Sequence, residues 1–391
     1  MLNILYIGPN DSEWAQMNRP VSLAAAKWAR GFLGALSKVA NVTALTHTYE
    51  IAWPKGKVFW RGYDKRLYNE GVECVSISYP VVKFIREFWL RHAYSRKARQ
   101  IIFSKRIDVV LLYNCDEWLA KVIRSIRVFS PEVKIIPFIL DGNDPRKDDW
   151  KWIKEAARYS DAMVALSWWV YENIPVKAGC IAYHFDGGAD CWRGVKPLPT
   201  RESNDTRPFR LVHTGALDKW RGLDIMIDIV NRMAQRRKDV KFIFCGKSSA
   251  KVLESVFRGN PQIELPGFLT EKDMVSLCNS ADILLNVRDP ENPDNILNYP
   301  SKLPHYLSFG RPIVSTRLKS LSPEYDDVVC FPSDGKDDPI EAFLEKIDEV
   351  LAWGGNRRIC EYNKIHRWFE QRKTWNIMVS NLIQWIEQEV M

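Results

Sequence analysis

Lys302, which follows Pro300 and Ser301, lies in the stretch of this chain with the clearest chemical content. The segment from Asn298 to Thr316 reads NYPSKLPHYLSFGRPIVST. Ser301 is a residue type that caps the amino end of a helix, and Gly310 is the type that ends a helix in a left-handed turn. Pro304 then falls in the first turn, where its missing N–H removes no hydrogen bond. The pattern predicts a helix whose amino end, beside Lys302, attracts phosphate.

The same segment resembles the donor-site run Pro-Ser-Lys-Leu-x-Glu-Tyr-Leu-x-x-Gly-(Lys/Arg)-Pro-Val-Val of nucleotide-sugar-dependent glycosyltransferases. These enzymes have the GT-B fold, and the closest likeness is to glycosyltransferase family 4. His305 stands where the family has a Glu that contacts the donor ribose, so the resemblance implies a ribose contact there. Leu297 stands where the family has a second Glu, and the paired-Glu signature is therefore missing at both positions.

Two further segments extend the resemblance. HTGALDKWRGLDIMIDIV, from His213 to Val230, is similar to the family's strand, glycine loop and Lys-Gly-x-Asp helix start, with Arg221 at the position of the diphosphate-binding Lys. FDGGAD, from Phe185 to Asp190, is similar to the Asn-Gly-Val-Asp turn that closes the N-terminal domain. The likeness covers most of residues 100–390. It implies that the donor diphosphate is bound by Gly215, Arg221, Ser301 and Lys302.

Glycosyl transfer expels a nucleoside diphosphate, whose developing charge needs cations, helix amino ends or a metal ion. Arg221 and Lys302 supply the cations. The sequence has no Asp-x-Asp triplet and no His/Cys cluster with ligand spacing, so we expect no metal and no cofactor besides the nucleotide-sugar donor. It also lacks GxGxxG and GxxxxGK[ST], which argues against the usual dinucleotide and P-loop sites. The resemblance implies nucleoside contacts at Gly246, Lys247, Gly267 and Phe268.

A fourth segment concerns the acceptor side of the reaction. FILDGNDP, from Phe138 to Pro145, resembles the family's Asp-x-His-Asp, with Asn143 in place of the His that lies near the reacting sugar. An inverting enzyme needs a base at the acceptor hydroxyl, and Asp141 or Asp144 could serve. In a retaining enzyme the leaving phosphate itself takes that proton. We expect retention, with these three residues at the catalytic centre.

The elements that must position these residues follow a βαβ alternation, which is typical of α/β domains with parallel sheets. With 391 residues the chain suits two such domains. A polar, proline-bearing stretch at residues 196–208 has the composition of a linker. The predicted strands are Asn3–Ile7, Val42–Thr46, Val109–Tyr113, Lys134–Leu140, Ala162–Leu166 and Cys180–His184, then Arg210–His213, Lys241–Cys245, Gln262–Leu265, Ile283–Asn286, Pro312–Ser315 and Val328–Phe331.

The resemblance implies a GT-B architecture, in which two Rossmann-like α/β/α domains face a cleft, and the βαβ alternation agrees with it. Residues 1–200 would form the acceptor-binding domain and residues 209–365 the domain that binds the nucleotide sugar. In the resembling fold a terminal helix crosses back to the first domain, which here would be residues 366–391.

Charge is unevenly placed along the chain, whose formal net charge is +8. Residues 51–106 hold 13 Lys and Arg against 4 Asp and Glu, interleaved with Trp53, Trp60, Phe88 and Trp89. Basic residues mixed with aromatics favour an anionic surface, either a membrane or a polyanionic acceptor. The start MLNILYIG has no signal-peptide pattern, and the eight cysteines show no C-x-x-C pair. We expect reduced thiols in a cytoplasmic enzyme that associates peripherally with the inner face of the membrane.

The sequence thus predicts a glycosyltransferase of class EC 2.4. The acceptor would be a glycan or lipid-linked glycan, in surface polysaccharide or lipopolysaccharide biosynthesis. Two alternatives stay open. One is a nucleotide-sugar epimerase of the same fold, against which the basic, aromatic N-terminal half counts. The other is a nucleic-acid-directed protein, either a glycosyltransferase for modified bases or a DNA-binding protein, for which a steep salt dependence of binding would speak.

Overall fold

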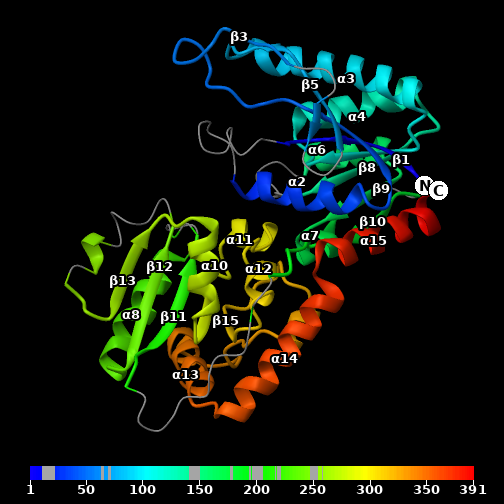
Figure 1. Cartoon of the computed structure of the whole chain (residues 1–391). Coiled ribbons are helices and arrows are strands. Elements are labelled where there is room, and N and C mark those ends of the chain that lie inside the picture. Colours follow the sequence, from blue (N-terminus) through cyan, green and yellow to red (C-terminus); the bar gives the residue numbers. More distant parts are fainter. Residues whose placement is uncertain are drawn as a thin grey trace. The chain divides into compact units, whose positions relative to one another are not determined.

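The computed structural model describes the chain except for residues 11–22, 63–65, 69–71, 141–149, 177–178, 193–194, 196–205, 216, 218–221, 247–253 and 258. The described residues divide into two compact units, whose elements are labelled in Figure 1. Unit 1 contains Met1–Gly188, Leu297–Tyr299 and Trp375–Met391. Unit 2 contains Ala189–Ile296 and Pro300–Thr374.

Unit 1 is built on an eight-stranded sheet of order β10-β9-β8-β7-β1-β2-β5-β4. Every neighbouring pair is parallel except β4 and β5, which run antiparallel at one edge. A separate antiparallel pair joins β3 and β6. The bounds are β1 (Asn3–Ile7), β2 (Asn41–Thr46), β3 (Phe59–Trp60), β4 (Arg66–Tyr68), β5 (Val72–Ser76), β6 (Tyr79–Pro80), β7 (Val109–Tyr113), β8 (Lys134–Ile139), β9 (Ala162–Ala165) and β10 (Ile181–His184).

Helices lie on both faces of this sheet (Figure 1). On one face α3, α4 and α6 pack side by side, and on the other α2 contacts α15. The central strands are buried on both sides, which is why they read as continuous apolar runs rather than as alternating patterns. The helices are α2 (Leu23–Leu36), α3 (Ile85–Lys105), α4 (Glu117–Phe129), α6 (Lys151–Tyr159), α7 (Trp168–Asn173) and α15 (Trp375–Trp385), followed by the π-helix η4 (Ile386–Val390).

Unit 2 is built on a five-stranded parallel sheet of order β13-β12-β11-β14-β15. Its main core lies under α8 and α13, which contact each other. The strands are β11 (Phe209–Thr214), β12 (Val240–Cys245), β13 (Ile263–Gly267), β14 (Ile283–Asn286) and β15 (Ile313–Ser315). The helices are α8 (Leu223–Arg236), α10 (Glu271–Asn279), α11 (Pro293–Leu297), α12 (Leu303–Leu307), η3 (Pro323–Asp327, a 3₁₀ helix), α13 (Pro339–Leu351) and α14 (Gly355–Arg372).

Eleven of the twelve predicted strands are present, with ends that differ by no more than two residues. The twelfth, Val328–Phe331, is wrong. Cys330 makes a single parallel bridge to Val314, and no strand forms around it. The chain enters this stretch directly from the 3₁₀ helix η3, so too few residues lie alongside β15 to build a ladder. The short strands β3 to β6 were not predicted, because the basic, aromatic segment that holds them lacks a long apolar run.

His47, which follows β2, gives unit 1 a measurable pH response. Its ring lies among the rings of Tyr79, Tyr94 and Trp118, and its Nδ1 is 2.8 Å from the Tyr94 hydroxyl. Burial, followed by the positive charge of Arg86, lowers the pKa of His47 to about 4. Below pH 6.5 the unfolded chain therefore binds a proton that the folded chain does not bind. Stability should fall as the pH drops from 6.5 and should level off near pH 4.

Because only the unfolded chain takes up this proton, we expect the free energy of unfolding to fall by up to about 3 kcal/mol between pH 6.5 and pH 4. Urea unfolding of the wild type and of His47→Gln, at pH 7 and pH 4.5, measures the effect. The variant should lose less stability on acidification than the wild type does. His92→Gln is the matched control, since His92 lies on the exposed face of α3. Equal pH dependence in the wild type and in His47→Gln would contradict the assignment.

Candidate functional site

Three glycines that we predicted as site residues lie at the carboxyl ends of parallel strands in unit 2. Gly215 follows β11 with φ 96°, and its N–H donates to the Cys245 carbonyl over 2.7 Å. The N–H of Gly246 donates to the carbonyl of Gly267 over 3.0 Å, and Gly267 has φ 73°. A methyl group added to Gly215 or Gly267 would meet no atom within 4 Å. These turns therefore present bare backbone to open space, at the edge where parallel sheets bind ligands.

Lys302 is held at this edge by a buried histidine. Its Nζ lies 3.0 Å from Nε2 of His213, a residue of β11 that is 1% exposed. Burial, and then the positive charges of Lys302 and Arg288, lower the pKa of His213 well below its usual value. The imidazole is therefore neutral, and its Nε2 accepts a hydrogen bond from the ammonium group. The lysine is in this way fixed beside the end of β11.

A tyrosine fixes the short helix that follows Lys302. The hydroxyl of Tyr306, on α12, accepts from the N–H of Thr214 over 2.8 Å and lies 3.1 Å from the Thr214 Oγ1. Tyr306 is 1% exposed, so this contact is shielded from water. Because Thr214 ends β11, the hydrogen bonds tie α12 to the same strand that carries His213. The strand and the helix together determine where Lys302 lies.

The predicted N-cap at Ser301 is wrong. The helix begins at Leu303, and the residue before it, Lys302, has helical backbone angles and makes no capping bond through its side chain. The N–H of Leu303 donates to the carbonyl of Pro300 over 2.9 Å, so a turn leads into the helix in place of an extended cap residue. Gly310 has the expected left-handed angle, with φ 60°, but the helix itself ends earlier, at Leu307. With only five residues α12 has a weak dipole, so the charge of Lys302 is the main attraction for an anion here.

The amino end of the longer helix α8 lies against the loop that follows β14. Gly222 is the N-cap of this 14-residue helix, with φ 83°. A Cβ at Gly222 would lie 2.9 Å from the Cα of Arg288, so the close approach as well as the backbone angle requires glycine. The unpaired N–H groups of the first turn of α8 are thus next to the start of this loop.

Arg288 is a cation that the sequence reasoning missed. It comes two residues after β14, its backbone N–H donates to Thr316 Oγ1 over 3.0 Å, and its Nη1 donates to Asn295 Oδ1 over 3.3 Å. Its charge acts on His213, as the charge of Lys302 does. The signal that could have found it is position, since it follows the predicted strand Ile283–Asn286 at the same sheet edge as Gly215. We add Arg288 to the candidate site.

The structure gives the other predicted site residues different surroundings. Phe268 follows Gly267 and is 62% exposed, and Ser301 is also exposed. His305 lies half-buried on α12, where its carbonyl accepts from Ser308 Oγ over 2.6 Å. The structure therefore brings Gly215, Gly246, Gly267 and Lys302 to one sheet edge. The remaining predicted residues lie outside the described part of the chain: Asp141, Asn143, Asp144, Arg221 and Lys247.

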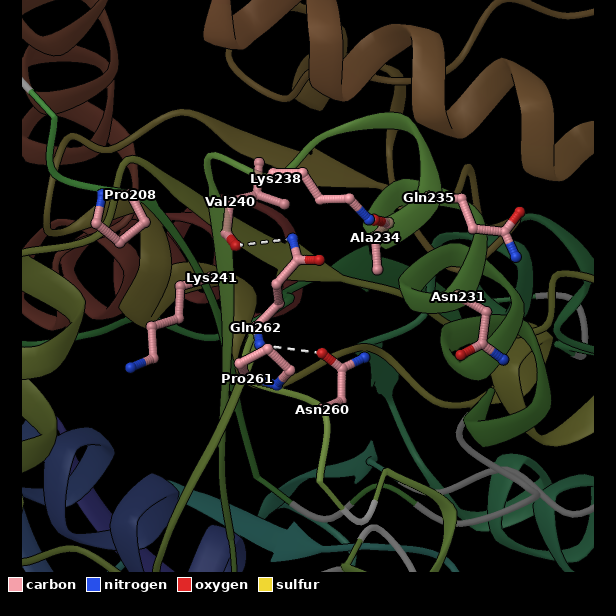
Figure 2. A pocket seen from close by; sticks show the side chains of 10 residues that line it. All are labelled: Pro208, Asn231, Ala234, Gln235, Lys238, Val240, Lys241, Asn260, Pro261 and Gln262. Atoms are coloured by element: carbon pink, nitrogen blue, oxygen red, sulfur yellow. Dashed lines mark hydrogen bonds between the residues drawn. The ribbon is translucent and has the colours of Figure 1, made fainter.

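A hollow of about 850 Å³ lies at the opposite edge of the same sheet (Figure 2). Pro208, Val240 and Gln262 line it where β11, β12 and β13 begin. The side-chain amide of Gln262 donates to the carbonyls of Arg237 and Val240, over 2.8 and 3.1 Å. The remaining lining is Asn231, Ala234, Gln235, Lys238, Lys241, Asn260 and Pro261. Among the described residues, none of those predicted to bind a donor lines this hollow.

Comparison with known proteins identifies the region that contains this site. Residues 208–352 match the family described as glycosyl transferases group 1. No curated protein matches the sequence.

Solved structures match over nearly the whole chain. A glycosyltransferase from Rickettsia africae ESF-5 has TM-score 0.68 at 12% identity and covers 99% of this chain and 98% of its own. The apo form of the lipopolysaccharide outer core galactosyltransferase WaaB has TM-score 0.65 at 15% identity, with 99% of both chains covered. A UDP-N-acetylglucosamine 2-epimerase from Listeria monocytogenes, described as putative, has TM-score 0.53 at 10% identity, with 98% and 94% covered. At these identities the matches show the fold, and the expected GT-B architecture is confirmed.

Proposed function

We propose that the chain takes its sugar from a nucleoside-diphosphate donor bound at the carboxyl edge of the unit 2 sheet. The match of residues 208–352 to the group 1 glycosyltransferases makes the chain an enzyme of class EC 2.4. The observation that supports the proposal most strongly is the pair of Lys302 and His213. The buried, neutral histidine keeps an ammonium group where a leaving diphosphate needs a cation. The acceptor is a glycan or a lipid-linked glycan.

The charges around Lys302 suit a diphosphate better than a single carboxylate. Arg288 supplies a second cation, and the amino end of α8 at Gly222 supplies N–H groups. We assign Arg221, which precedes this helix, as a third cation. Two phosphates that gain negative charge in the transition state are then matched by positive groups that need no metal ion. The bare backbone at Gly215 and Gly267 leaves room for the nucleoside.

A nucleotide screen tests this proposal. Nucleoside diphosphates of the different bases, added in EDTA, should include at least one that raises the melting temperature, since a ligand at 100 times its Kd stabilises the native state by about 2.7 kcal/mol. The matching nucleoside without phosphates is the control and should give a much smaller shift. Activity with the corresponding sugar donor should also survive EDTA. Loss of both binding and activity in EDTA, with recovery in Mn²⁺ or Mg²⁺, would contradict a metal-independent site.

For the chemistry we propose retention of the anomeric configuration. The leaving phosphate, held by fixed cations, accepts the proton of the acceptor hydroxyl as the new bond forms. Asp141, Asn143 and Asp144 then orient the acceptor and the reacting sugar. This assignment rests on the sequence resemblance of the segment Phe138–Pro145.

The proposal for the acceptor is supported by a surface of unit 1, which we call the basic-aromatic surface. It consists of Trp53, Phe59, Phe84, Phe88 and Trp89, whose exposed fractions run from 47% for Trp89 to 87% for Phe84. These residues lie around the β3–β6 pair and the start of α3. Backbone pairing joins β3 to β6, and the Trp89 Nε1 donates to the carbonyl of Ser78 over 3.2 Å. Trp60, which we expected at this surface, is partly buried against the core of unit 1.

Cations border the same aromatic rings. Lys83 Nζ lies 5.3 Å from the ring centre of Phe84, and the guanidinium of Arg91 lies 5.3 Å from that of Phe88. Exposed aromatics framed by lysine and arginine suit a membrane interface with anionic lipids. No helix in the described part of the chain is long and apolar enough to cross a membrane.

We therefore propose that the enzyme binds peripherally to the cytoplasmic face of an anionic membrane. Its acceptor there is a lipid-linked glycan of surface polysaccharide or lipopolysaccharide assembly. All eight cysteines are free, and five of them are buried, as suits a reducing compartment.

A further inference from the structure

Two residues of helix α14 and one cysteine far from them in the sequence offer ligand types that zinc takes. They are Cys191, His366 and Glu370, and one ligand atom from each lies within 4.8 Å of the others. His366 Nδ1 is 3.4 Å from Glu370 Oε2, and Cys191 Sγ is 3.9 Å from Glu370 Oε1. None of the three belongs to the candidate donor site.

These separations are close to those that a tetrahedral ion imposes. Around zinc, a nitrogen and an oxygen ligand lie about 3.4 Å apart, and a sulfur and an oxygen ligand about 3.6 Å apart. The two contacts use different oxygens of the Glu370 carboxylate, Oε2 toward His366 and Oε1 toward Cys191, so the carboxylate must turn to share one ion with both. Thiolate and imidazole favour zinc over the harder magnesium and calcium ions, which take oxygen ligands.

The helix α14 fixes two of the ligands. His366 and Glu370 are four residues apart on it, so their side chains lie one above the other on the same face. The His366 ring also packs against the Tyr362 ring, with centres 5.6 Å apart and an interplanar angle of 25°. The imidazole is thus supported one turn earlier on the same helix.

Cys191 is held beside this face because the backbone is tied to α14 and its end on both sides of it. Before it, the N–H of Ala189 donates to the carbonyl of Lys373 over 3.0 Å. After it, the hydroxyl of Tyr362 donates to the carbonyl of Val195 over 3.0 Å. The thiol itself is exposed, so an ion can reach it from solvent.

We propose that Cys191, His366 and Glu370 form a binding site for a divalent transition-metal ion, Zn²⁺ in preference to Mg²⁺ or Ca²⁺. Three protein ligands leave the fourth position to water. The bound ion joins the segment around Cys191 to α14, so it stabilises unit 2. None of its ligands is among the residues assigned to the donor, so the proposal does not rest on the proposed glycosyl transfer.

Cobalt titration of the full chain, followed by competition with zinc, tests the site without an activity assay. The wild type should bind one Co²⁺, with the visible bands of a tetrahedral ion and a near-ultraviolet charge-transfer band from a cobalt–thiolate bond. Cys191→Ser should lose the charge-transfer band. His366→Gln and Glu370→Gln should bind at least about 10-fold more weakly, the lower end of what losing even an outer-shell partner costs.

The control is Cys360→Ser, which removes the other exposed cysteine and lies on the same helix. It should keep the band and the affinity of the wild type. Zinc should raise the melting temperature of the wild type and of Cys360→Ser, and leave that of Cys191→Ser unchanged. An unaltered charge-transfer band in Cys191→Ser, or no stoichiometric binding by the wild type, would overturn the proposal.

Discussion

Replacing Lys302 by alanine is expected to lower turnover by about 10²-fold or more, the usual scale for removing one preorganised partner of a developing anion. The ammonium group is fixed by His213 at 3.0 Å, so the wild type needs no rearrangement as the diphosphate gains charge. The loss should persist at saturating donor, because the missing interaction is strongest in the transition state. Initial rates at saturating donor and acceptor measure it. Arg221→Ala, outside the described residues, should behave in the same way.

The matched control is Lys241→Ala. Lys241 is also a lysine of unit 2, but it lies at the opposite edge of the sheet, where its Nζ is 3.4 Å from Glu264. Its removal should leave turnover close to that of the wild type. Near-wild-type turnover of Lys302→Ala at saturating donor would remove this residue from the proposed diphosphate site.

A triple substitution of Phe84, Phe88 and Trp89 by serine should reduce binding to anionic vesicles by on the order of 10²-fold. Each ring is about half or more exposed. Its transfer from water into the membrane interface contributes about 1 kcal/mol, which is less than full burial would give. Three such rings together account for on the order of 10²-fold in affinity. The cations nearby add an attraction that fades within a Debye length, so binding should weaken steeply with salt. Sedimentation with anionic and neutral vesicles at low and high salt measures both effects.

Phe103→Ser is the control for this experiment. Phe103 is 59% exposed on the same helix, α3, but it lies about 20 Å along the helix axis from Phe88. It should leave vesicle binding unchanged. If the wild type does not sediment with anionic vesicles at low salt, the basic-aromatic surface faces a soluble anionic acceptor and membrane binding is rejected.

The architecture could be predicted because parallel strands that are buried on both faces appear in the sequence as continuous apolar runs. The runs at Asn3–Ile7 and Ile283–Asn286 have the same bounds in the structure as in the prediction. By contrast, Val328–Phe331 is apolar because it is buried, without pairing as a strand. An apolar segment indicates burial. Whether its backbone also pairs as a strand depends on which segments lie beside it in the fold, and the segment's own sequence does not specify those.

The candidate site was predictable where the backbone imposes a residue type. Gly215 and Gly267 have positive φ, so glycine appears in the sequence at those turns. The roles of His213 and Arg288 could not be predicted in the same way. Both depend on contacts between residues of different strands and loops, such as the 3.0 Å approach of His213 to Lys302. In the sequence, a histidine inside an apolar strand looks the same whether its side chain packs in the core or holds a cation in place.

A crystal structure of the chain with the nucleoside diphosphate that gives the largest thermal shift tests the central claim most directly. The account predicts that the diphosphate lies within hydrogen-bonding distance of Lys302 Nζ, with the nucleoside over the glycine turns at Gly215 and Gly267. A nucleotide bound instead in the hollow at the opposite edge of the sheet (Figure 2), with no contact to Lys302, would contradict it.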